Sequence, residues 1–445
     1  MSQLSSVERP ADGLQLDEPP PKRQIVIALC ASVAGWSLDL YDLFILLYVA
    51  PALGALFFPS HIPTLSLAAV YAAFAVSCVV RPFGSVVFGS YADKHGRKKT
   101  LLLTMGGVGV ITSLMGVLPT IQQVGLLAPV LLLCLRVLQG LFVGGVVAAT
   151  HTIGTETVPP SWRGWVSGAI TGAGGGLGSL LASVVFLVIS TLFPGDSFNV
   201  WGWRCMFFTG LLSALVAILL FNHLNESPFF LQLQKAKKIA TKSPVKIIFT
   251  EKYRRITIQN ILVVFGAAGM YYLTSGYMPT FLAVVNKLPK PEIATILVAC
   301  GVVATLSPIL IGQLSEMIGR RLAFIISAAA GLVLFGLAGF NQMVGLPNGT
   351  TLVACGLILV FIGNGVYAPV LIFLNERFPT AIRASGTAVC WNIGFAMGGL
   401  MPMFASYLSK DTSSIPGVLT WLLIALSVLV IVSIFFAKET RGQFE

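Results

Sequence analysis

Long apolar stretches recur along the whole chain, and they leave few folds open to it. A helix must be roughly 20 residues long to cross a hydrocarbon core about 30 Å thick. Twelve stretches reach that length, at approximately 24–50, 64–88, 101–121, 127–150, 164–193, 203–224, 257–283, 293–317, 322–342, 350–375, 383–408 and 416–437. Transmembrane β-strands would be only about ten residues long, with alternating polar and apolar side chains. The sequence therefore predicts an all-α membrane protein with twelve transmembrane helices.

The charged residues are few, and their placement predicts how the helices are oriented. Only 10% of the residues are charged, against roughly 25% in a soluble domain. The net charge of +11 comes largely from basic residues in alternate loops. These are Lys94, Arg97, Lys98, Lys99, Lys235, Lys237, Lys238, Lys242, Lys246, Lys252, Arg254, Arg255, Arg320 and Arg321. By the positive-inside rule, both termini and the central loop are predicted to be cytoplasmic, in a plasma or inner membrane. Anionic lipid, and not nucleic acid, is the expected partner of this charge.

Three short motifs occur twice, in the same order and with nearly constant spacing. "GSYADKHGRKK" after the second stretch matches "GQLSEMIGRR" after the eighth. "ETVPPSWRG" matches "ERFPTAIR" after the fourth and tenth stretches, and "NESP" matches "KETRG" after the sixth and twelfth. Such a repeat indicates two related, pseudo-symmetric six-helix bundles. We expect cytoplasmic tails at 1–23 and 438–445, bundles at 24–225 and 257–437, and a cytoplasmic loop at 226–256.

The first of these motifs resembles the signature loop of the major facilitator superfamily. Its pattern is G-x-x-x-D-[KR]-x-G-R-[KR]-[KR], and this chain matches it fully from Gly89 to Lys99. "RVLQG", "WGWRCMFF" and "NESPFFLQL" are similar to the metabolite:proton symporter branch, whose members carry organic acids or zwitterions. Two departures matter, because Asp39 replaces a glutamate of the first helix and Val146 stands where the branch usually has another. The resemblance implies the major facilitator fold and secondary transport.

Four charged residues fall deep inside the predicted helices. Asp39 and Asp42 lie in the first helix, Arg81 in the second and Arg136 in the fourth. A charge at the bilayer centre costs about 2.5–3.5 kcal/mol on insertion scales, so each is a functional candidate. From the helical rise per residue, Asp39, Asp42 and Arg136 lie about 21–27 Å from the cytoplasmic side, and Arg81 about 10–12 Å. We therefore predict that Arg136 faces one of the two aspartates, with Arg81 nearer the cytoplasm.

A carboxylate that faces a guanidinium can couple a substrate to a proton. When a substrate carboxylate takes over the arginine, the aspartate loses its counter-ion and binds a proton more readily. Linkage requires the converse, so protonation raises the affinity for substrate. By resemblance to sugar-porter relatives, the acid of this pair maps to Asp42 and the base to Arg136. Asp42 is thus the first candidate for the proton carrier and Asp39 the second. Alternatively, the acids only order helix packing through an ion pair.

Further candidates lie on helices that line the cavity in this superfamily. Arginine can hold a substrate carboxylate through its planar fork, and Tyr and Asn can donate hydrogen bonds to it. The predicted substrate-binding residues are Arg136, Arg81, Tyr41, Tyr271, Tyr272, Tyr277, Asn364, Tyr367, Trp391 and Asn392. The glycine-rich segment 168–179 lies inside an apolar stretch with no preceding strand. It is therefore predicted to pack helices closely and not to bind a nucleotide.

The repeated loop motifs predict a cytoplasmic gate. Gly89, Gly96 and Gly319 are expected to permit close backbone approach, and the charged residues to hold one bundle against the other. The predicted gating residues are Gly89, Asp93, Gly96, Arg97, Glu156, Arg163, Gly319, Arg320, Glu376 and Arg383.

Together these features predict proton-coupled symport of a small organic anion by alternating access. Three alternatives stay open: proton-coupled export of drugs or metabolites, symport of a zwitterion such as proline or betaine, and a sensor that binds a ligand without moving it. The sequence contains no Ser/His/Asp set, metal cluster or nucleotide loop at usable positions. We therefore expect no enzyme, no metal site and no cofactor besides the coupling proton, in a protein that is monomeric.

Overall fold

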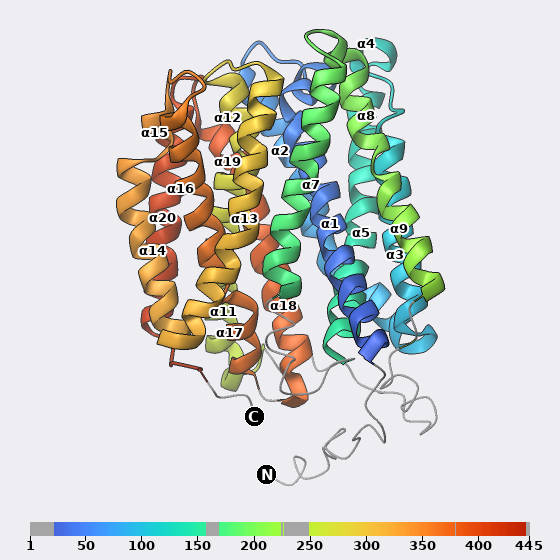
Figure 1. Ribbon diagram of the computed structural model, residues 1–445, viewed down its shortest axis with the longest axis vertical. Helices are drawn as coiled ribbons and strands as arrows, with labels where there is room; N and C mark the ends of the chain where they lie inside the picture. The colour runs from blue at the N-terminus through green and yellow to red at the C-terminus, as the bar shows by residue number, and fades with distance from the viewer. Residues whose placement is uncertain (1–21, 157–168, 224–225, 227–248, 379, 442–445) are drawn as a thin grey trace.

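The computed structural model describes residues 22–156, 169–223, 226, 249–378 and 380–441. Every regular element in this part of the chain is a helix, and the long helices run roughly parallel to one another as a bundle (Figure 1). The predicted fold class, an all-α membrane protein with twelve transmembrane helices in two six-helix bundles, is confirmed.

The first bundle is drawn from blue to green in Figure 1. Its first four spans are α1 (Lys22–Phe57), α2 (Pro63–His95), α3 (Arg97–Met115) and α5 (Leu127–Glu156). The fifth span is the π-helical turn η2 (Ala169–Ala173) followed by α7 (Gly174–Leu192). The sixth joins η3 (Phe198–Gly202), α8 (Trp203–Phe208) and α9 (Leu211–His223), and the short α4 (Ile121–Val124) precedes α5.

The second bundle is drawn from yellow to red. Its first span joins α11 (Glu251–Tyr271), the π-helical turn η5 (Tyr272–Gly276) and α12 (Met278–Val284). Two spans follow as α13 (Lys290–Ile318) and α14 (Arg320–Leu337), with the short α15 (Phe340–Met343) after them. The last three are α16 (Thr350–Tyr367) with α17 (Val370–Arg377), α18 (Thr380–Gly399) with α19 (Met401–Leu408), and α20 (Ile415–Phe435).

The observed helices run past the predicted apolar stretches. Within the described residues, 11 helices are long and apolar enough to cross a membrane. The remaining span is α3, whose first turn is basic and therefore less apolar. The second helix ends at His95 where the stretch was predicted to end at 88, and α11 begins at Glu251 where 257 was predicted. Apolar length predicts only the part inside hydrocarbon, whereas a helix can continue among the headgroups, where charged side chains are solvated.

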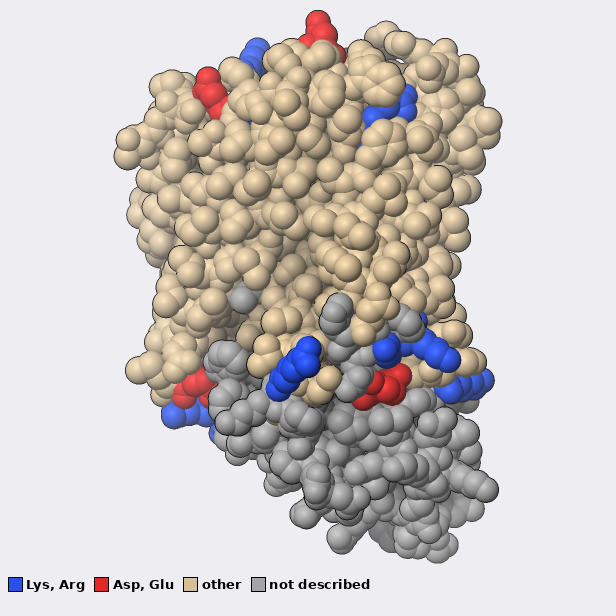
Figure 2. Space-filling model, turned by 45° about the vertical axis from the view of Figure 1, so that its right-hand side comes forward, with Lys and Arg blue, Asp and Glu red and all other residues tan. Residues whose placement is uncertain are grey.

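Charged side chains gather at the two ends of the molecule, with an apolar belt between them (Figure 2). We call one end the basic end. It carries Lys98 and Lys99 at the start of α3, Arg254 in α11 and Arg321 at the start of α14. Among the described residues the opposite end carries fewer basic side chains, Lys287 among them. The belt and the helix lengths are those of a multi-pass membrane protein.

The glycine-rich start of α7 fits closely between two other helices. A Cβ atom at Gly178 would overlap the backbone of α1 at Ser37, and one at Gly176 would overlap the backbone of α13 at Thr305. Only glycine allows these contacts, so the predicted packing role of segment 168–179 is confirmed for its described part. Because α7 belongs to the first bundle and α13 to the second, this contact is one seam between the bundles.

Glycines also bring α2 and α5 together inside the first bundle. A Cβ atom at Gly140 would overlap the carbonyl oxygen of Ser77, and one at Gly144 would overlap that of Arg81. Small residues let two helices approach this closely in a membrane. The contact places the backbone of Arg81 against Gly144, about two turns along α5 from Arg136.

We predict that Gly144→Ala lowers the free energy of unfolding by about 1–3 kcal/mol, because the added methyl group must push α2 away from α5. Gly106→Ala in α3 is the matched control, since a Cβ atom there meets nothing within 4 Å and alanine favours a helix over glycine. Unfolding of the detergent-purified protein measures both changes. Equal stability of Gly144→Ala and the wild type would contradict the close contact.

Candidate functional site

The four charged residues predicted to lie deep in the membrane are all buried, and they meet inside the first bundle. Asp39 and Asp42 come from α1, Arg81 from α2 and Arg136 from α5. Their exposed fractions are 4, 1, 7 and 1%, so none of them faces lipid. We call these four residues the charged cluster.

Arg81 lies deeper than its sequence position predicted. Its Nη1 atom is 4.0 Å from Oδ2 of Asp39, so the two side chains form an ion pair. The expected depth of about 10–12 Å was wrong because α2 continues to His95. Counted from there, Arg81 lies about 21 Å along the helix, and its ion pair places it beside Asp39.

Asp42 and Arg136 do not contact each other directly in this structure. The Ser213 hydroxyl of α9 donates to Oδ2 of Asp42 at 2.9 Å. Arg136 donates from Nη1 to Oε1 of Gln139 at 2.7 Å, and Gln139 donates in turn to the Thr112 hydroxyl at 2.8 Å. The predicted facing pair is therefore present as two buried neighbours, each held by a polar side chain of its own.

Several polar atoms of the charged cluster have no hydrogen-bond partner among the described residues. Within the described part of the chain, Nε and Nη2 of Arg136 have no hydrogen-bond partner, and neither do the Oδ1 atoms of Asp39 and Asp42. Buried polar groups are nearly always paired, so each exception needs an explanation. Nε and Nη2 form one edge of the guanidinium, and such an edge can bind both oxygens of a carboxylate.

Aromatic rings of the second bundle cover the charged cluster. Tyr367 stacks on Tyr271 with ring centres 5.6 Å apart, and Trp391 stacks on Phe395 at 4.6 Å. Trp36 of α1 reaches across the seam to within 6.0 Å of the Trp391 ring. The Tyr271 hydroxyl has no partner among the described residues. Rings from both bundles thus form one wall of the site, in line with the predicted placement of Tyr271, Tyr367 and Trp391.

The span that carries these tyrosines is not a regular helix. α11 gives way to the π-helical turn η5, which starts at Tyr272, and the span then resumes with Pro279 in its first turn. Single π-helical turns are frequent at functional sites because they redirect side chains. The Tyr272 ring packs edge-on against Phe74 of α2 and Phe395 of α18, so it lies at the seam.

Two of the predicted substrate-binding tyrosines, Tyr41 and Tyr277, do not point toward the charged cluster. The Tyr41 hydroxyl donates to Thr209 inside the first bundle, so Tyr41 does not line the space between the bundles. Tyr277 stacks on Tyr71 at 5.1 Å and shares a hydrogen bond with Ser406, nearer the end opposite the basic end. The sequence pattern along an almost wholly apolar helix does not predict which face of the first or seventh span meets the other bundle.

Both predicted asparagines are held by their surroundings. The side-chain amide of Asn364 donates to the Ser275 hydroxyl at 2.8 Å. That of Asn392 donates to the carbonyl oxygen of Ala388 at 2.9 Å and lies 3.5 Å from the Ser85 hydroxyl of the first bundle. Their predicted contact with substrate stays a prediction.

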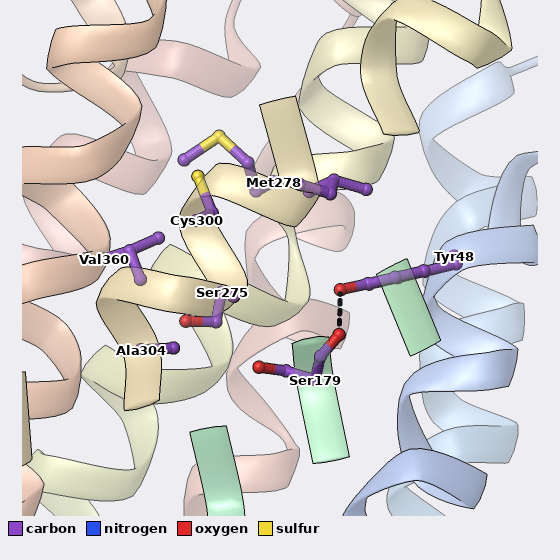
Figure 3. Close-up of a pocket in the computed structure, with 9 residues that line it drawn as sticks. Tyr48, Ser179, Ser275, Met278, Cys300, Ala304 and Val360 are labelled. Carbon is purple, nitrogen blue, oxygen red and sulfur yellow. Dashed lines mark hydrogen bonds between the residues drawn. The ribbon is translucent and has the colours of Figure 1, made fainter. Parts of the chain in front are cut away.

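The charged cluster is tightly enclosed in this structure. The space that Asp39, Arg81 and Arg136 line together with Gln139 and Ser77 does not hold a water-sized sphere. A separate cavity of about 10 Å³ lies at the seam, where Tyr48 and Ser179 face Ser275 and Cys300 (Figure 3). That volume suits roughly one water molecule. A substrate therefore needs the bundles to move apart before it can reach the charges.

The repeated loop motifs form matching caps at the basic end. Gly96 and Gly319 adopt nearly the same left-handed backbone, with φ of 99° and 97°, which favours glycine. Glu226, after the sixth span, accepts from the backbone N–H of Lys98 at 3.2 Å. Glu439, after the twelfth, accepts from the N–H of Arg321 at 3.0 Å. Each bundle thus ties the start of its third span to the end of its sixth.

In the second bundle, the hydrogen bonds of the cap change the pKa of Glu439. Partial burial of Glu439 raises its pKa. Backbone N–H groups of Arg441, Arg320, Arg321 and Thr440 donate to its carboxylate, and together they lower the pKa below the ordinary value. A carboxylate at the N-terminus of a helix is also favoured by the helix dipole.

Other predicted gating residues have different contacts from those expected. Glu376 pairs with Arg320 at 3.1 Å, with both side chains 2% exposed, and both belong to the second bundle. The pair therefore does not hold one bundle against the other. The expected close approach at Gly89 is also wrong, because a Cβ atom there meets nothing within 4 Å. The side chains of Asp93, Arg97, Glu156 and Arg383, and the whole of Arg163, lie outside the described residues.

Sequence reasoning missed four residues of the site. Trp36 stands in the same motif as the aspartates, "GWSLDLYDLF", and Gln139 three residues after Arg136 in "RVLQG". The i, i+3 spacing on a helix could have placed Gln139 beside the arginine. Ser213 and Phe395 carry no comparable signal, because serine and phenylalanine are common in membrane helices.

The fold and the buried charged cluster are those expected of a secondary transporter. The sequence profile of the Major Facilitator Superfamily matches residues 26–401, and the chain belongs to that family. The resemblance seen in the loop motifs is thus confirmed, and the protein is a transporter and not an enzyme.

Curated relatives cover nearly the whole chain. The inner membrane metabolite transport protein YhjE of Escherichia coli (strain K12) is 30% identical over 93% of this chain and 94% of its own length. The proline/betaine transporter of Salmonella typhimurium is 28% identical over 94% of this chain and 84% of its own. A partially occluded, inward-open structure of the xylose transporter XylE from E. coli has the same fold. Its TM-score is 0.74 at 20% identity, over 94% of this chain and 99% of that one.

We predict that Glu376→Gln lowers the free energy of unfolding by about 3 kcal/mol, because it removes the buried carboxylate beside Arg320 and leaves only the exposed Glu316 as a counter-ion. Glu316→Gln is the matched control. Glu316 pairs with the same arginine but its side chain is 51% exposed, so its loss should cost less than about 1 kcal/mol. Unfolding of both variants in detergent tests the difference, and similar losses would show that burial is not decisive here.

Proposed function

We propose that this transporter takes up a small carboxylate-bearing metabolite together with a proton. The observation that carries the proposal is the open edge of Arg136, whose Nε and Nη2 lack partners among the described residues although the side chain is 1% exposed. Arginine stays charged at any physiological pH and its planar fork matches a carboxylate. A carboxylate is therefore the ligand that would satisfy this edge.

Asp42 is the proposed proton site, and Asp39 is the second candidate. Asp42 and Arg136 interact electrostatically without an ion pair. A substrate carboxylate on Arg136 would neutralise the nearest positive charge, and a proton on Asp42 would then be favoured. Substrate and proton would bind together, and each would raise the affinity for the other. The bundles would then rock around the loaded site.

A zwitterion is the second candidate substrate, and two observations favour it. The Arg81–Asp39 pair is long, at 4.0 Å, so a substrate ammonium group could replace Arg81 at Asp39. The rings of Tyr367 and Trp391 cover the cluster, and aromatic faces attract cations. Relatives named as proline/betaine transporters fit this reading.

The orientation of the protein in the membrane, and the membrane in which it lies, are also proposals. We place the basic end in the cytoplasm by the positive-inside rule, and the protein in an inner membrane, as the name of the YhjE relative suggests. Anionic lipid would meet the basic end. The bundle boundaries at 24–225 and 257–437, and the monomeric state, stay predictions from the sequence.

Reconstituted vesicles test the substrate class. We predict that an inward proton gradient drives accumulation of a labelled small carboxylate, and that Arg136→Lys lowers uptake about 10- to 100-fold, because a bidentate charge-assisted pair is lost. Arg254→Gln, an exposed arginine at the basic end, is the control and should leave uptake unchanged.

Competition separates the candidates. If simple carboxylates inhibit uptake of the labelled compound, a carboxylate substrate is supported. If only zwitterions inhibit it, a zwitterionic substrate is supported. No response to any carboxylate or zwitterion ends both, and accumulation on the opposite side of the membrane indicates export.

The acids have a separate test. We predict that Asp42→Asn abolishes uptake driven by a proton gradient while substrate exchange at equal pH persists, because a neutral amide can complete the translocation step but cannot carry a proton. Asp39→Asn is measured in parallel. Normal gradient-driven uptake in both variants would remove both acids from the coupling mechanism.

A further inference from the structure

The sixth span is broken beside the charged cluster. α8 ends at Phe208 and α9 begins at Leu211, and Thr209 and Gly210 form a turn between them. The N–H groups of Gly210, Leu212 and Ser213 bond to carbonyl oxygens three residues back, so the chain is more tightly wound than an α-helix. We call residues 209–213 the span-6 turn.

The span-6 turn holds the acid side of the cluster. The Ser213 hydroxyl donates to Oδ2 of Asp42 at 2.9 Å. One residue before Asp42, the Tyr41 hydroxyl donates to Thr209. Two consecutive side chains of α1 are therefore fixed by the two ends of one turn.

The same turn supports the base side. Gly210 packs so closely on α3 that a Cβ atom would lie 2.7 Å from the side chain of Thr112. Thr112 accepts from Gln139, and Gln139 accepts from Arg136. The guanidinium is thus held by a chain of hydrogen bonds that ends against Gly210, and both members of the predicted pair rest on this turn.

We infer that Ser213 is a positioning residue for proton coupling: its hydroxyl holds the Asp42 carboxylate, and this hydrogen bond sets the pH at which Asp42 takes up its proton. This rests on the proposed function of Asp42. Without the serine hydroxyl, Oδ2 of Asp42 loses the hydrogen bond that stabilises the ionised carboxylate.

The groups that face Asp42 define what else acts on it. Asp39 and Tyr41 lie on its own helix, and Arg136 faces it from α5. On α8, Arg204 is bound by the carbonyl oxygens of Gly116 and Leu118 at the opposite end, and Cys205 is on the same helix. The other polar groups that the sixth span brings here are the hydroxyls of the span-6 turn.

The test uses Ser213→Ala in the full-length protein. Removing a hydrogen bond donated to a carboxylate favours the protonated acid, so protonation of Asp42 should occur about one pH unit higher. Two readouts follow it: the pH at which gradient-driven uptake falls to half, and the pH midpoint of the infrared carboxyl band that Asp42→Asn removes. Ser213→Thr keeps the hydroxyl and should restore both midpoints.

Ser190→Ala is the matched control. Ser190 is also fully buried, but its hydroxyl donates to the Leu187 carbonyl oxygen of its own helix, so both midpoints should stay at the wild-type value. If Ser213→Ala does not fold, Ser213→Cys replaces it, because a thiol of similar size is only a weak donor and should shift the midpoints the same way. In an Asp42→Asn background, Ser213→Ala should have no further effect on pH dependence.

The outcomes are separable from those of the proposed function. Unchanged midpoints in Ser213→Ala or Ser213→Cys, with a titrating Asp42 band in the wild type, overturn the inference. A wild type that lacks this band overturns Asp42 as the proton site and the inference with it. A titrating band that shifts as expected, in a protein that transports no carboxylate, supports the inference and overturns only the proposed substrate.

Discussion

Exclusion of water from the charged cluster is the constraint on which the site depends. Moving a charged side chain out of water costs several kcal/mol even after the protein relaxes around it. The cluster contains two acids and two bases, so its formal charges cancel, and hydroxyl and amide groups take part of the remaining hydrogen-bonding capacity. This balance needs the helices to be very close, which the glycines between α2 and α5 allow. Packing and electrostatics are therefore one problem in this bundle.

The sequence was sufficient for the architecture because apolar length and repeated motifs are local signals. Twelve stretches gave twelve spans, and the motif pairs corresponded to real structural equivalence, down to the backbone angles of Gly96 and Gly319. The sequence also predicted that four charged residues are buried: Asp39, Asp42, Arg81 and Arg136. Each lies within an apolar stretch, and a charge there must face the interior of a membrane protein.

The pairing inside the site could not be predicted in the same way. Which acid meets which base depends on where each helix starts and how it is rotated. A difference of seven residues in the end of α2, from 88 to His95, moved Arg81 by about two turns of helix. The direction of Tyr41 depends on the turn at Thr209, which belongs to a distant part of the chain. Contacts of this kind are tertiary, and a single sequence carries no periodic signal for them.

The matched caps at the basic end have a mechanical consequence. Because Glu226 and Glu439 each anchor the third span of a bundle to the end of its sixth, the two six-helix units are braced against internal shear. Between the units, the described contacts include an Asn392–Ser85 approach, a Tyr71–Thr280 hydrogen bond, the Trp36–Trp391 rings and the close packing of α7 on α13 at Gly176. When two braced units meet through uncharged contacts, deformation concentrates at their common boundary, so a small rotation of one unit first changes the packing of the side chains that span this boundary.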